Sequence, residues 1–230
     1  MDLIGEVAAW FTDPVHWAGT AGIPNRVFEH VWLSGLTVLV GTAVAVPIGL
    51  AIGHTGRGAF LVVSVANLGR ALPSYALLLI FFTFFGIGFA TAFPALLALT
   101  IPPILTGTSV GVKEVDRDMV EAGRGMGMTE LQLLRRVELP LALPVIIAGV
   151  RTAAVQVVAT ATLAALVGGG GLGRFIVDGF ALQQDDQLVG GALLVAGLAL
   201  VTERLFTALE HRLISSGLRD AGAFRLLPAS

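Results

Sequence analysis

Long apolar stretches separated by short polar ones make up most of this chain. Five of them are long enough to cross a bilayer, at approximately residues 31–53, 59–85, 90–112, 143–167 and 188–209. A helix rises about 1.5 Å per residue, so a hydrocarbon core about 30 Å thick requires about 20 apolar residues. None of the five shows strand alternation, and in lipid a helix satisfies its own backbone polar groups. The pattern predicts an all-α polytopic membrane protein with about five transmembrane helices.

The composition agrees with a membrane protein and excludes several other classes. Of the 230 residues, 55% are hydrophobic and 13% are charged, and the mean hydropathy is +0.86, far above that of an ordinary soluble domain. A net charge of -2 gives no sign of nucleic-acid binding. The chain has no cysteine, which excludes disulfides and thiolate chemistry. The histidines lack ligand spacing, so we expect no metal site; they are His16, His30, His54 and His211.

Basic residues outside the apolar stretches predict how the chain is oriented. Short cytoplasmic loops are enriched in Lys and Arg. Nine basic residues fall on one side: Arg57, Lys113, Arg117, Arg124, Arg135, Arg136, Arg212, Arg219 and Arg225. Only Arg26 and Arg174 fall on the other. We therefore expect an N-terminus outside and a C-terminus in the cytoplasm.

This orientation divides the chain into segments. Residues 1–30 are expected to be extracytoplasmic, residues 31–210 to form the transmembrane domain, and residues 211–230 to form a cytoplasmic tail. Within the domain, loop 113–142 is expected inside and the glycine-rich loop 168–187 outside. Arg26 is the first Lys or Arg of the chain, so the N-terminus lacks the basic region of a secretory signal. We expect the first span to be retained.

Three basic residues lie within the apolar stretches themselves. An Arg at the middle of a span, such as Arg70, costs about 2.5–3.5 kcal/mol unless it is paired or hydrated. A functional role is the first hypothesis for Arg70; the alternative is that Pro73 breaks the helix and Arg70 bonds the freed carbonyls. Two explanations are open for Arg151. Either the fourth span begins later than residue 143, or the guanidinium faces protein and water within the membrane. Arg204 lies near the inner end of the fifth span and can snorkel beside Glu203.

The polar loop between the third and fourth stretches has the pattern of two short helices joined by a turn. Asp118 is a candidate cap of the first helix, with Glu121 three residues later. Thr129 and Gln132 have capping-box spacing for the second helix, which Pro140 is expected to end. Three glycines supply the permissive backbone of the turn: Gly123, Gly125 and Gly127. Three apolar residues make the second helix amphipathic: Leu131, Leu134 and Val137. Such a hairpin is suited to docking into another protein.

The same loop resembles the Glu-Ala-Ala loop of bacterial ATP-binding-cassette (ABC) import permeases. The match begins at Glu121 and Ala122, continues with Gly127 six residues after Glu121, and reaches Val137 ten residues after Gly127. Leu139 and Pro140 complete it. Two positions depart conservatively from the pattern: Gly123 replaces the second Ala, and Val137 replaces Ile.

The resemblance implies a type I ABC importer permease of the bacterial cytoplasmic (inner) membrane. In that family the loop enters a cleft of the ATPase and transmits its closure to the spans. The implied coupling residues are Glu121, Ala122, Gly123, Gly127, Thr129, Leu131, Leu134, Val137, Leu139 and Pro140. The implied partners are two ATPase subunits, a second copy or a similar permease, an extracytoplasmic binding protein and the bilayer. The chain lacks a G-x-x-x-x-G-K-[ST] motif, so we expect no enzyme activity and no cofactor here; ATP and Mg belong to the ATPase.

Further stretches resemble permeases for osmoprotectants such as glycine betaine, choline, carnitine and proline betaine. They are residues 70–74, 86–88, 94–95, 125–154 and 161–179. The resemblance implies a translocation pathway, for which the candidates are Arg70, Pro73, Ser74, Tyr75 and Arg151. The alternative that the chain is a permease for another small solute, such as methionine, is not excluded by these stretches. A stand-alone secondary transporter or channel is a more distant alternative, because five spans do not suggest inverted repeats.

The orientation can be tested by labelling, since the chain has no cysteine of its own. A single cysteine placed between residues 118 and 140 should react with a membrane-impermeant maleimide only after the cells are permeabilised. A cysteine in loop 168–187 is the matched control and should react in intact cells. Reaction of the 118–140 position from outside would contradict the orientation and the docking role together.

Overall fold

The computed structural model describes residues 2–213, apart from the side chains of Arg70 and Leu213. All regular structure in this part of the chain is helical. The elements are α1 (Leu3–Thr12), a 3₁₀ turn (Pro14–Trp17), α2 (Ile23–Thr55), α3 (Ala59–Ala71), α4 (Ser74–Phe85), α5 (Phe89–Lys113), α6 (Arg117–Gly125), α7 (Glu130–Leu133), a π-helical segment (Leu134–Glu138), α8 (Leu139–Thr160), a 3₁₀ segment (Ala161–Val167), α9 (Gly173–Leu182) and α10 (Asp185–Leu213).

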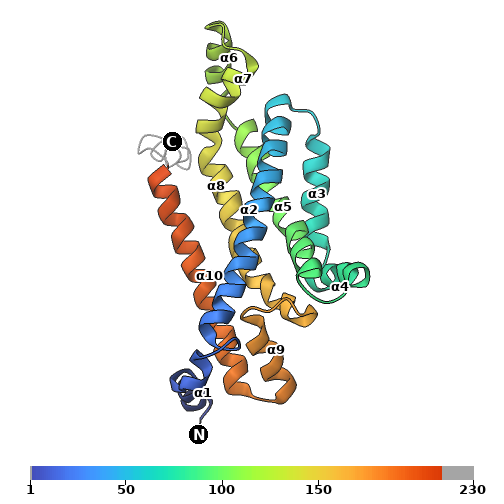
Figure 1. Cartoon of the computed structure of the whole chain (residues 1–230). Coiled ribbons are helices and arrows are strands. Elements are labelled where there is room, and N and C mark those ends of the chain that lie inside the picture. The colour runs from blue at the N-terminus through green and yellow to red at the C-terminus, as the bar shows by residue number, and fades with distance from the viewer. Residues whose placement is uncertain (1, 214–230) are drawn as a thin grey trace, which may run out of the picture.

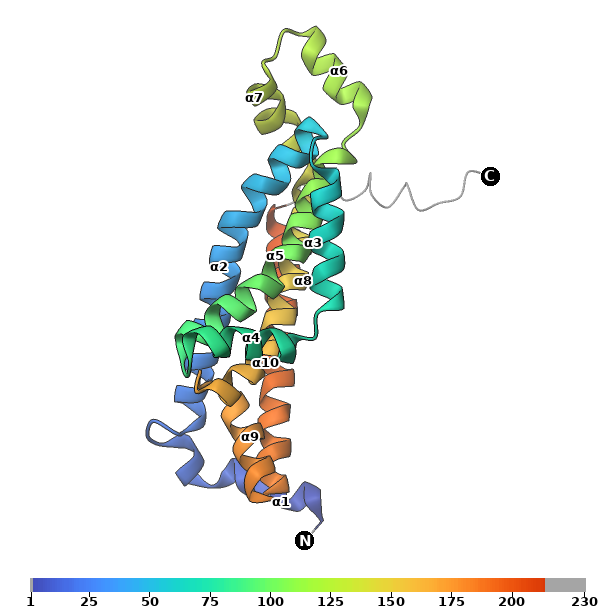
Figure 2. The same ribbon diagram turned by 90° about the vertical axis from the view of Figure 1, so that its right-hand side faces the viewer.

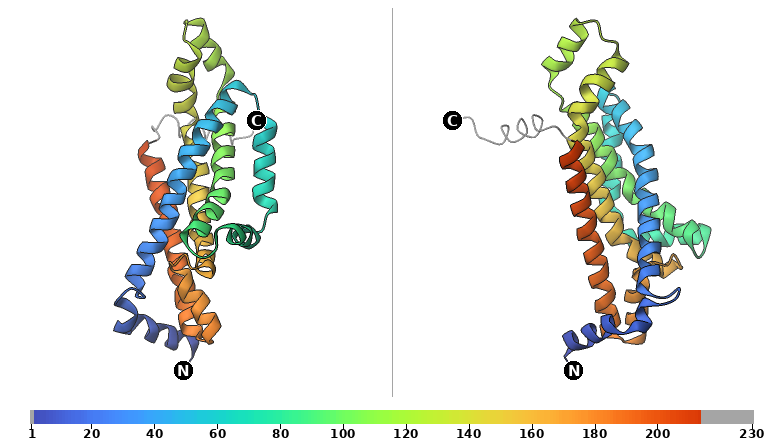
Figure 3. Two further views of the ribbon diagram at one scale, coloured as in Figure 1. Left: turned by 45° about the vertical axis from the view of Figure 1, so that its right-hand side comes forward. Right: turned by 60° about the vertical axis from the view of Figure 1, so that its left-hand side comes forward.

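The helices form an elongated bundle with a helical hairpin at one end (Figure 1). Helices α6 and α7 make that hairpin, whereas α1 and α9 lie at the opposite end (Figure 3). The basic loop 113–142 is thus far from the glycine-rich loop 168–187, as the expected orientation requires. Which end faces the cytoplasm stays a prediction. Arg219 and Arg225, which contributed to that argument, lie outside the described residues.

Four spans are confirmed by helix length and apolar composition, and a bent pair of helices makes a fifth if it is counted as one span. Four helices are long and apolar enough to cross a membrane: Ile23–Thr55, Phe89–Lys113, Glu130–Val167 and Asp185–Arg212. The fifth candidate consists of Ala59–Gly69 and Ser74–Phe85, which meet at 94°.

Residues 59–85 do not form the continuous helix that was expected, because Pro73 interrupts it. Proline has no N–H to continue a helix, and it pushes the residue before it into extended conformation. Leu72 indeed has φ -81° and ψ 121°, and Pro73 has φ -60° and ψ 129°. Helix α4 consequently runs across the bundle instead of along it (Figure 2).

The fourth span also differs from expectation, since Pro140 does not end a helix. Helix α7, the π segment and α8 continue into one another. The Leu139 N–H bonds the Leu134 carbonyl five residues earlier, which widens the turn just before Pro140. A widened turn of this kind lets a helix pass a residue that would otherwise break it. The span therefore begins inside the hairpin.

Helix α2 packs closely on α5 through glycines. A Cβ added to Gly41 would lie 2.6 Å from Thr100, and one added to Gly49 would lie 2.6 Å from Thr108. At Gly53 the nearest atom would be Cβ of Val112, at 2.7 Å. Small residues at these points let the two backbones approach, as in other transmembrane helix pairs. The Gly49 and Gly53 pair is thus a packing motif.

At the end opposite the hairpin, α2 holds the glycine-rich loop. The Glu29 carboxylate accepts from the Gly171 N–H at 2.8 Å. The ring of His30, which is 1% exposed, accepts from the Leu172 N–H at 3.2 Å and lies 2.8 Å from the Val158 carbonyl through Nε2. Three loop glycines have positive φ: Gly168, Gly170 and Gly171. This turn leads directly into α9.

The glycine contact between α2 and α5 predicts a contrast between two matched substitutions. Gly49→Ala should destabilise the fold by about 1–3 kcal/mol, because the new methyl group overlaps Thr108. Gly35→Ala on the same helix is the control, since a Cβ there meets nothing within 4 Å. Thermal unfolding of the purified protein in detergent measures both. Equal unfolding temperatures for the two variants would contradict the packing account.

Candidate functional site

The hairpin begins with an Asp cap. The Asp116 carboxylate accepts from the backbone N–H of Asp118 at 2.9 Å, and α6 starts at Arg117. The expectation that Asp118 caps this helix was wrong, because Asp118 lies one residue inside the first turn. At that position the negative charge of Asp118 still interacts favourably with the positive N-terminal end of the helix dipole.

The turn after α6 depends on one glycine rather than three. Gly127 has φ +80°, a left-handed conformation that costs other residues about 1–2 kcal/mol. The Met128 N–H bonds the Gly123 carbonyl at 3.2 Å, and the Gly127 N–H bonds the Arg124 carbonyl at 2.9 Å. These two bonds form a Schellman motif. Gly123 and Gly125 are helical residues of α6.

Helix α7 starts with the capping box that the sequence predicted. The Gln132 N–H bonds Thr129 Oγ1 at 3.4 Å, and the Thr129 N–H bonds Gln132 Oε1 at 2.9 Å. Leu133, fully buried, packs at Gly123, where a Cβ would lie 3.0 Å from its Cδ2. The glycine that departs from the family pattern thus lies where the two arms of the hairpin touch.

Leu133 was missed from the sequence, although a signal for it exists. Met128 precedes the Thr129 cap and Leu133 is the fourth helical residue, which is the spacing of a hydrophobic staple. Leu134 and Val137 are half-buried, whereas Leu131 is 56% exposed. The inner face of the hairpin is therefore defined by Leu133 more than by the three predicted positions.

Several candidate coupling residues lie on the outside of the hairpin. Glu121 and Ala122 are exposed, and Met119 and Met126 are 51% and 72% exposed. Leu131 is a third exposed apolar side chain of the hairpin, and Glu121 also lines a pocket between α6 and the end of α2. Exposed Met and Leu side chains of this kind are suited to contact with another protein.

An ion pair braces the two arms of the hairpin. Arg124 Nε lies 3.1 Å from Glu130 Oε1, and Nη2 lies 3.0 Å from Oε2. The hydrogen bonds and charge of Glu130 raise the pKa of the Arg124 guanidinium above its ordinary value. Both side chains are about half exposed, so the pair orients the arms and contributes little to stability.

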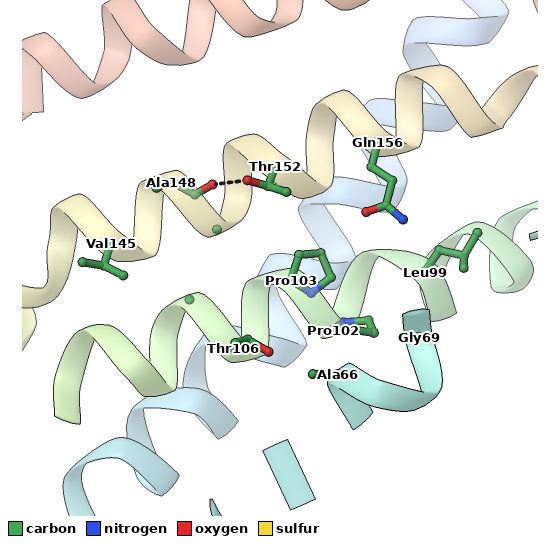
Figure 4. A pocket seen from close by; sticks show the side chains of 12 residues that line it. Ala66, Gly69, Leu99, Pro102, Pro103, Thr106, Val145, Ala148, Thr152 and Gln156 are labelled. Atoms are coloured by element: carbon green, nitrogen blue, oxygen red, sulfur yellow. Dashed lines mark hydrogen bonds between the residues drawn. The ribbon is translucent and has the colours of Figure 1, made fainter. Parts of the chain in front are cut away.

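A cavity of about 430 Å³ lies between α3, α5 and α8 (Figure 4). Its lining includes Gly69, Pro102, Pro103, Thr106, Thr152 and Gln156. Gln156 extends from α8 toward α5, and Thr152 bonds the Ala148 carbonyl at 2.9 Å (Figure 4). The prolines have no N–H, so the carbonyls of Ala98 and Leu99 receive no helical bond from them. Among the side chains that the structure assigns to this cavity, none is ionisable.

The candidate pathway residues do not lie together in the structure. Pro73 forms the bend, Ser74 begins α4, and Tyr75 is 49% exposed on α4; the cavity lining does not include them. Arg70 belongs to α3, and its side chain lies outside the described part. The structure therefore brings α3, but not the residues after it, to the cavity.

Arg151 pairs with α10. Its guanidinium lies 3.2 Å from Glu210 and 3.6 Å from Glu203. Within the described residues, Glu203 is thus engaged by Arg151, while the expected neighbour Arg204 is exposed. The fourth span begins earlier than expected, at Glu130, so of the two alternatives for Arg151 the structure agrees with a position that faces protein. No group of three or more potential metal ligands occurs among the described residues.

These features agree with a comparison against protein families. The model of the family described as "Binding-protein-dependent transport system inner membrane component" matches residues 27–215. The chain belongs to this family and is a multi-pass protein of the inner membrane, a permease component of a transporter.

Individual relatives and solved structures refine this similarity. The chain is 42% identical over 196 residues to the carnitine transport permease protein OpuCB of Listeria monocytogenes, covering 85% of this chain and 90% of that one. It is 38% identical over 194 residues to the choline transport system permease protein OpuBB of Bacillus subtilis (strain 168), covering 84% and 89%. A chain from inward-facing MetNI methionine ABC transporter crystals has the same fold, with a TM-score of 0.77, 21% identity, and coverage of 89% and 100%.

The left-handed turn predicts a contrast between neighbouring glycines. Gly127→Ala should loosen the hairpin, because alanine is strained at φ +80°. It should reduce by roughly fivefold to thirtyfold the amount of ATPase that co-purifies with the chain, as a loss of about 1–2 kcal/mol predicts. Gly125→Ala is the control, since a Cβ there meets nothing within 4 Å. Normal ATPase recovery with Gly127→Ala would contradict a docking role for this turn.

Proposed function

We propose that this chain is the membrane subunit of an ATP-driven importer for osmoprotectants of the glycine betaine, choline and carnitine type. The observation that carries the substrate class is its identity of 38–42% to permeases named for choline and carnitine transport, along most of each chain. Family membership and the hairpin support the same role independently.

The hairpin supports a coupling role. It projects from the bundle (Figure 2), and Glu121, Ala122, Met119 and Leu131 are exposed on it. In the proposed complex the tip enters a cleft of an ATPase subunit on the cytoplasmic side. Two such ATPases bind ATP and Mg, and two permease subunits, identical or similar, enclose the passage.

The cavity between α3, α5 and α8 supports a passage for small solutes. A volume of about 430 Å³ lies within the range of small-molecule sites. Its lining offers oxygen acceptors, from Thr106, Thr152 and Gln156 and from carbonyls near Pro102 and Pro103. Partial negative charge on such oxygens attracts a quaternary ammonium group weakly. A weak site suits a passage whose tight recognition is done by a separate extracytoplasmic binding protein.

Transport would then proceed by alternating access. ATP-driven closure of the ATPases would move the hairpins of the two permeases together and open the passage outward, and hydrolysis would reset it. Pro102 and Pro103 of α5 line the cavity, and α3, which also lines it, ends at the bend before α4. These are points at which helices can change direction without losing further hydrogen bonds.

Uptake by the reconstituted complex tests this proposal. Liposomes that contain the chain, its ATPase and its binding protein should import at least one of labelled glycine betaine, choline and carnitine when ATP is enclosed with the ATPase. Labelled methionine should not accumulate. The control is an ATPase whose P-loop Lys is replaced, which should abolish uptake. Import of methionine alone, or import without nucleotide, would contradict the proposal.

A further inference from the structure

A cluster of polar side chains joins the end of α2 to the base of the hairpin. His54 lies in the last turn of α2 and is 13% exposed. Its Nδ1 is 2.5 Å from Glu138 Oε2, and its Nε2 is 3.3 Å from Glu130 Oε2. Glu130 in turn holds Arg124 of α6. One imidazole thus contacts both ends of the segment between α6 and α8.

Glu138 is the buried member of this cluster. Its residue is only 5% exposed, and a buried carboxylate is costly unless it is paired and hydrogen-bonded. It is the last residue of the π-helical segment Leu134–Glu138, an irregularity often found at functional positions of helices. The hydrogen bond from His54 pairs the buried carboxylate of Glu138. Glu138 lies at the junction between the hairpin and the part of the fourth span formed by α8.

Helix α2 is rigidly attached to the rest of the bundle. Gly49 and Gly53 lie directly against Thr108 and Val112 of α5, so α2 cannot rotate without moving α5. The backbone provides only two links between hairpin and bundle. One is the non-helical stretch 114–116 after α5, and the other is the continuous helix into α8. His54 adds a third link, from side chains alone.

We propose that His54, Glu138 and Glu130 form a polar strut that makes α2 move with the hairpin when a partner pushes on α6. The strut converts displacement of the docking tip into motion of the α2–α5 pair as well as of α8. Without it, α2 would follow the hairpin only indirectly, through its packing against α5 and α8. His54 is a positioning residue in this scheme and contacts no solute. The inference rests on the proposed coupling to an ATPase.

Spin-label distances test the strut directly. The chain has no native cysteine, so cysteines at Thr55, on the end of α2, and at Asp118, exposed on α6 outside the proposed docking residues, can be labelled as a pair. In the wild-type complex with its ATPase, the distance distribution between them should be narrow and should not change when ATP binds. In His54→Ala it should broaden, and its mean should shift by several ångströms with ATP.

Matched variants separate the strut from a general loss of structure. His54→Gln, whose amide can still donate to Glu138, should restore the narrow distribution. Arg135→Ala, on the exposed side of the same π segment, should leave it unchanged. Glu138→Ala should reproduce the broadening. The double variant with His54→Ala should broaden the distribution no further, because each substitution removes the same hydrogen bond between His54 and Glu138. An unchanged distribution in His54→Ala, or a wild-type distance that shifts with ATP, would overturn the proposal.

Coupling efficiency gives a second readout that a merely structural contact would not alter. In His54→Ala the number of ATP molecules hydrolysed per solute imported should rise at least fivefold, while the ATPase still co-purifies. An unchanged ratio would overturn the strut. Failure of the proposed function would give a different result. Either no ATPase would co-purify with the wild-type chain, or the complex would import no osmoprotectant although its label distances behave as described.

Discussion

Backbone N–H and C=O groups inside a bilayer can bond only to one another, and the architecture of this chain follows from that constraint. Its spans are helices, and each interruption has a local cause that leaves few groups unpaired. Pro73 makes the sharp bend between α3 and α4, and the π segment before Pro140 keeps the fourth span continuous. The glycine-rich loop is bonded by Glu29 and His30 of α2. The irregular backbone of the glycine-rich loop is thus satisfied by side chains of α2.

The hairpin and the cavity are connected by the same helices. The fourth span begins inside the hairpin at Glu130 and continues past the cavity to Val167. Helix α5 leads from the cavity to the start of α6. In the proposed mechanism, a push on the hairpin would be transmitted along these helices to the residues that line the cavity, because the α7 side is continuously helical. The proposed strut at His54 would extend this connection to α2 at the base of the hairpin.

Local patterns in the sequence predicted the features that depend on near neighbours. The spans follow from hydropathy, the capping box from Thr129 and Gln132, and the turn from its glycines. The 94° bend was not fixed in advance, because a proline can kink a membrane helix or break it, depending on what surrounds it. Pro140 illustrates the other outcome. Leu133 had a readable staple signal, but Asp116 and Asp118 compete as caps over two residues, and pattern alone does not choose between them.

Contacts between distant residues were beyond prediction from one sequence. His54 and Glu138 are 84 positions apart, and neither has a motif that points to the other. The same holds for the cavity, whose lining comes from three helices. The sequence did identify Arg151 as unusual within an apolar stretch, but it could not say that Glu203 and Glu210 of α10 would pair with it.

This last cluster has a consequence for how the protein enters the membrane. Arg151 on α8 is synthesised 59 positions before Glu210, so its carboxylate partners on α10 do not yet exist when α8 leaves the ribosome. Helix α10 in turn carries two carboxylates that are poorly tolerated in hydrocarbon alone. Arg151 and Glu210 neutralise each other only when both helices are in place, so the final pairing of the fourth span depends on synthesis of the fifth.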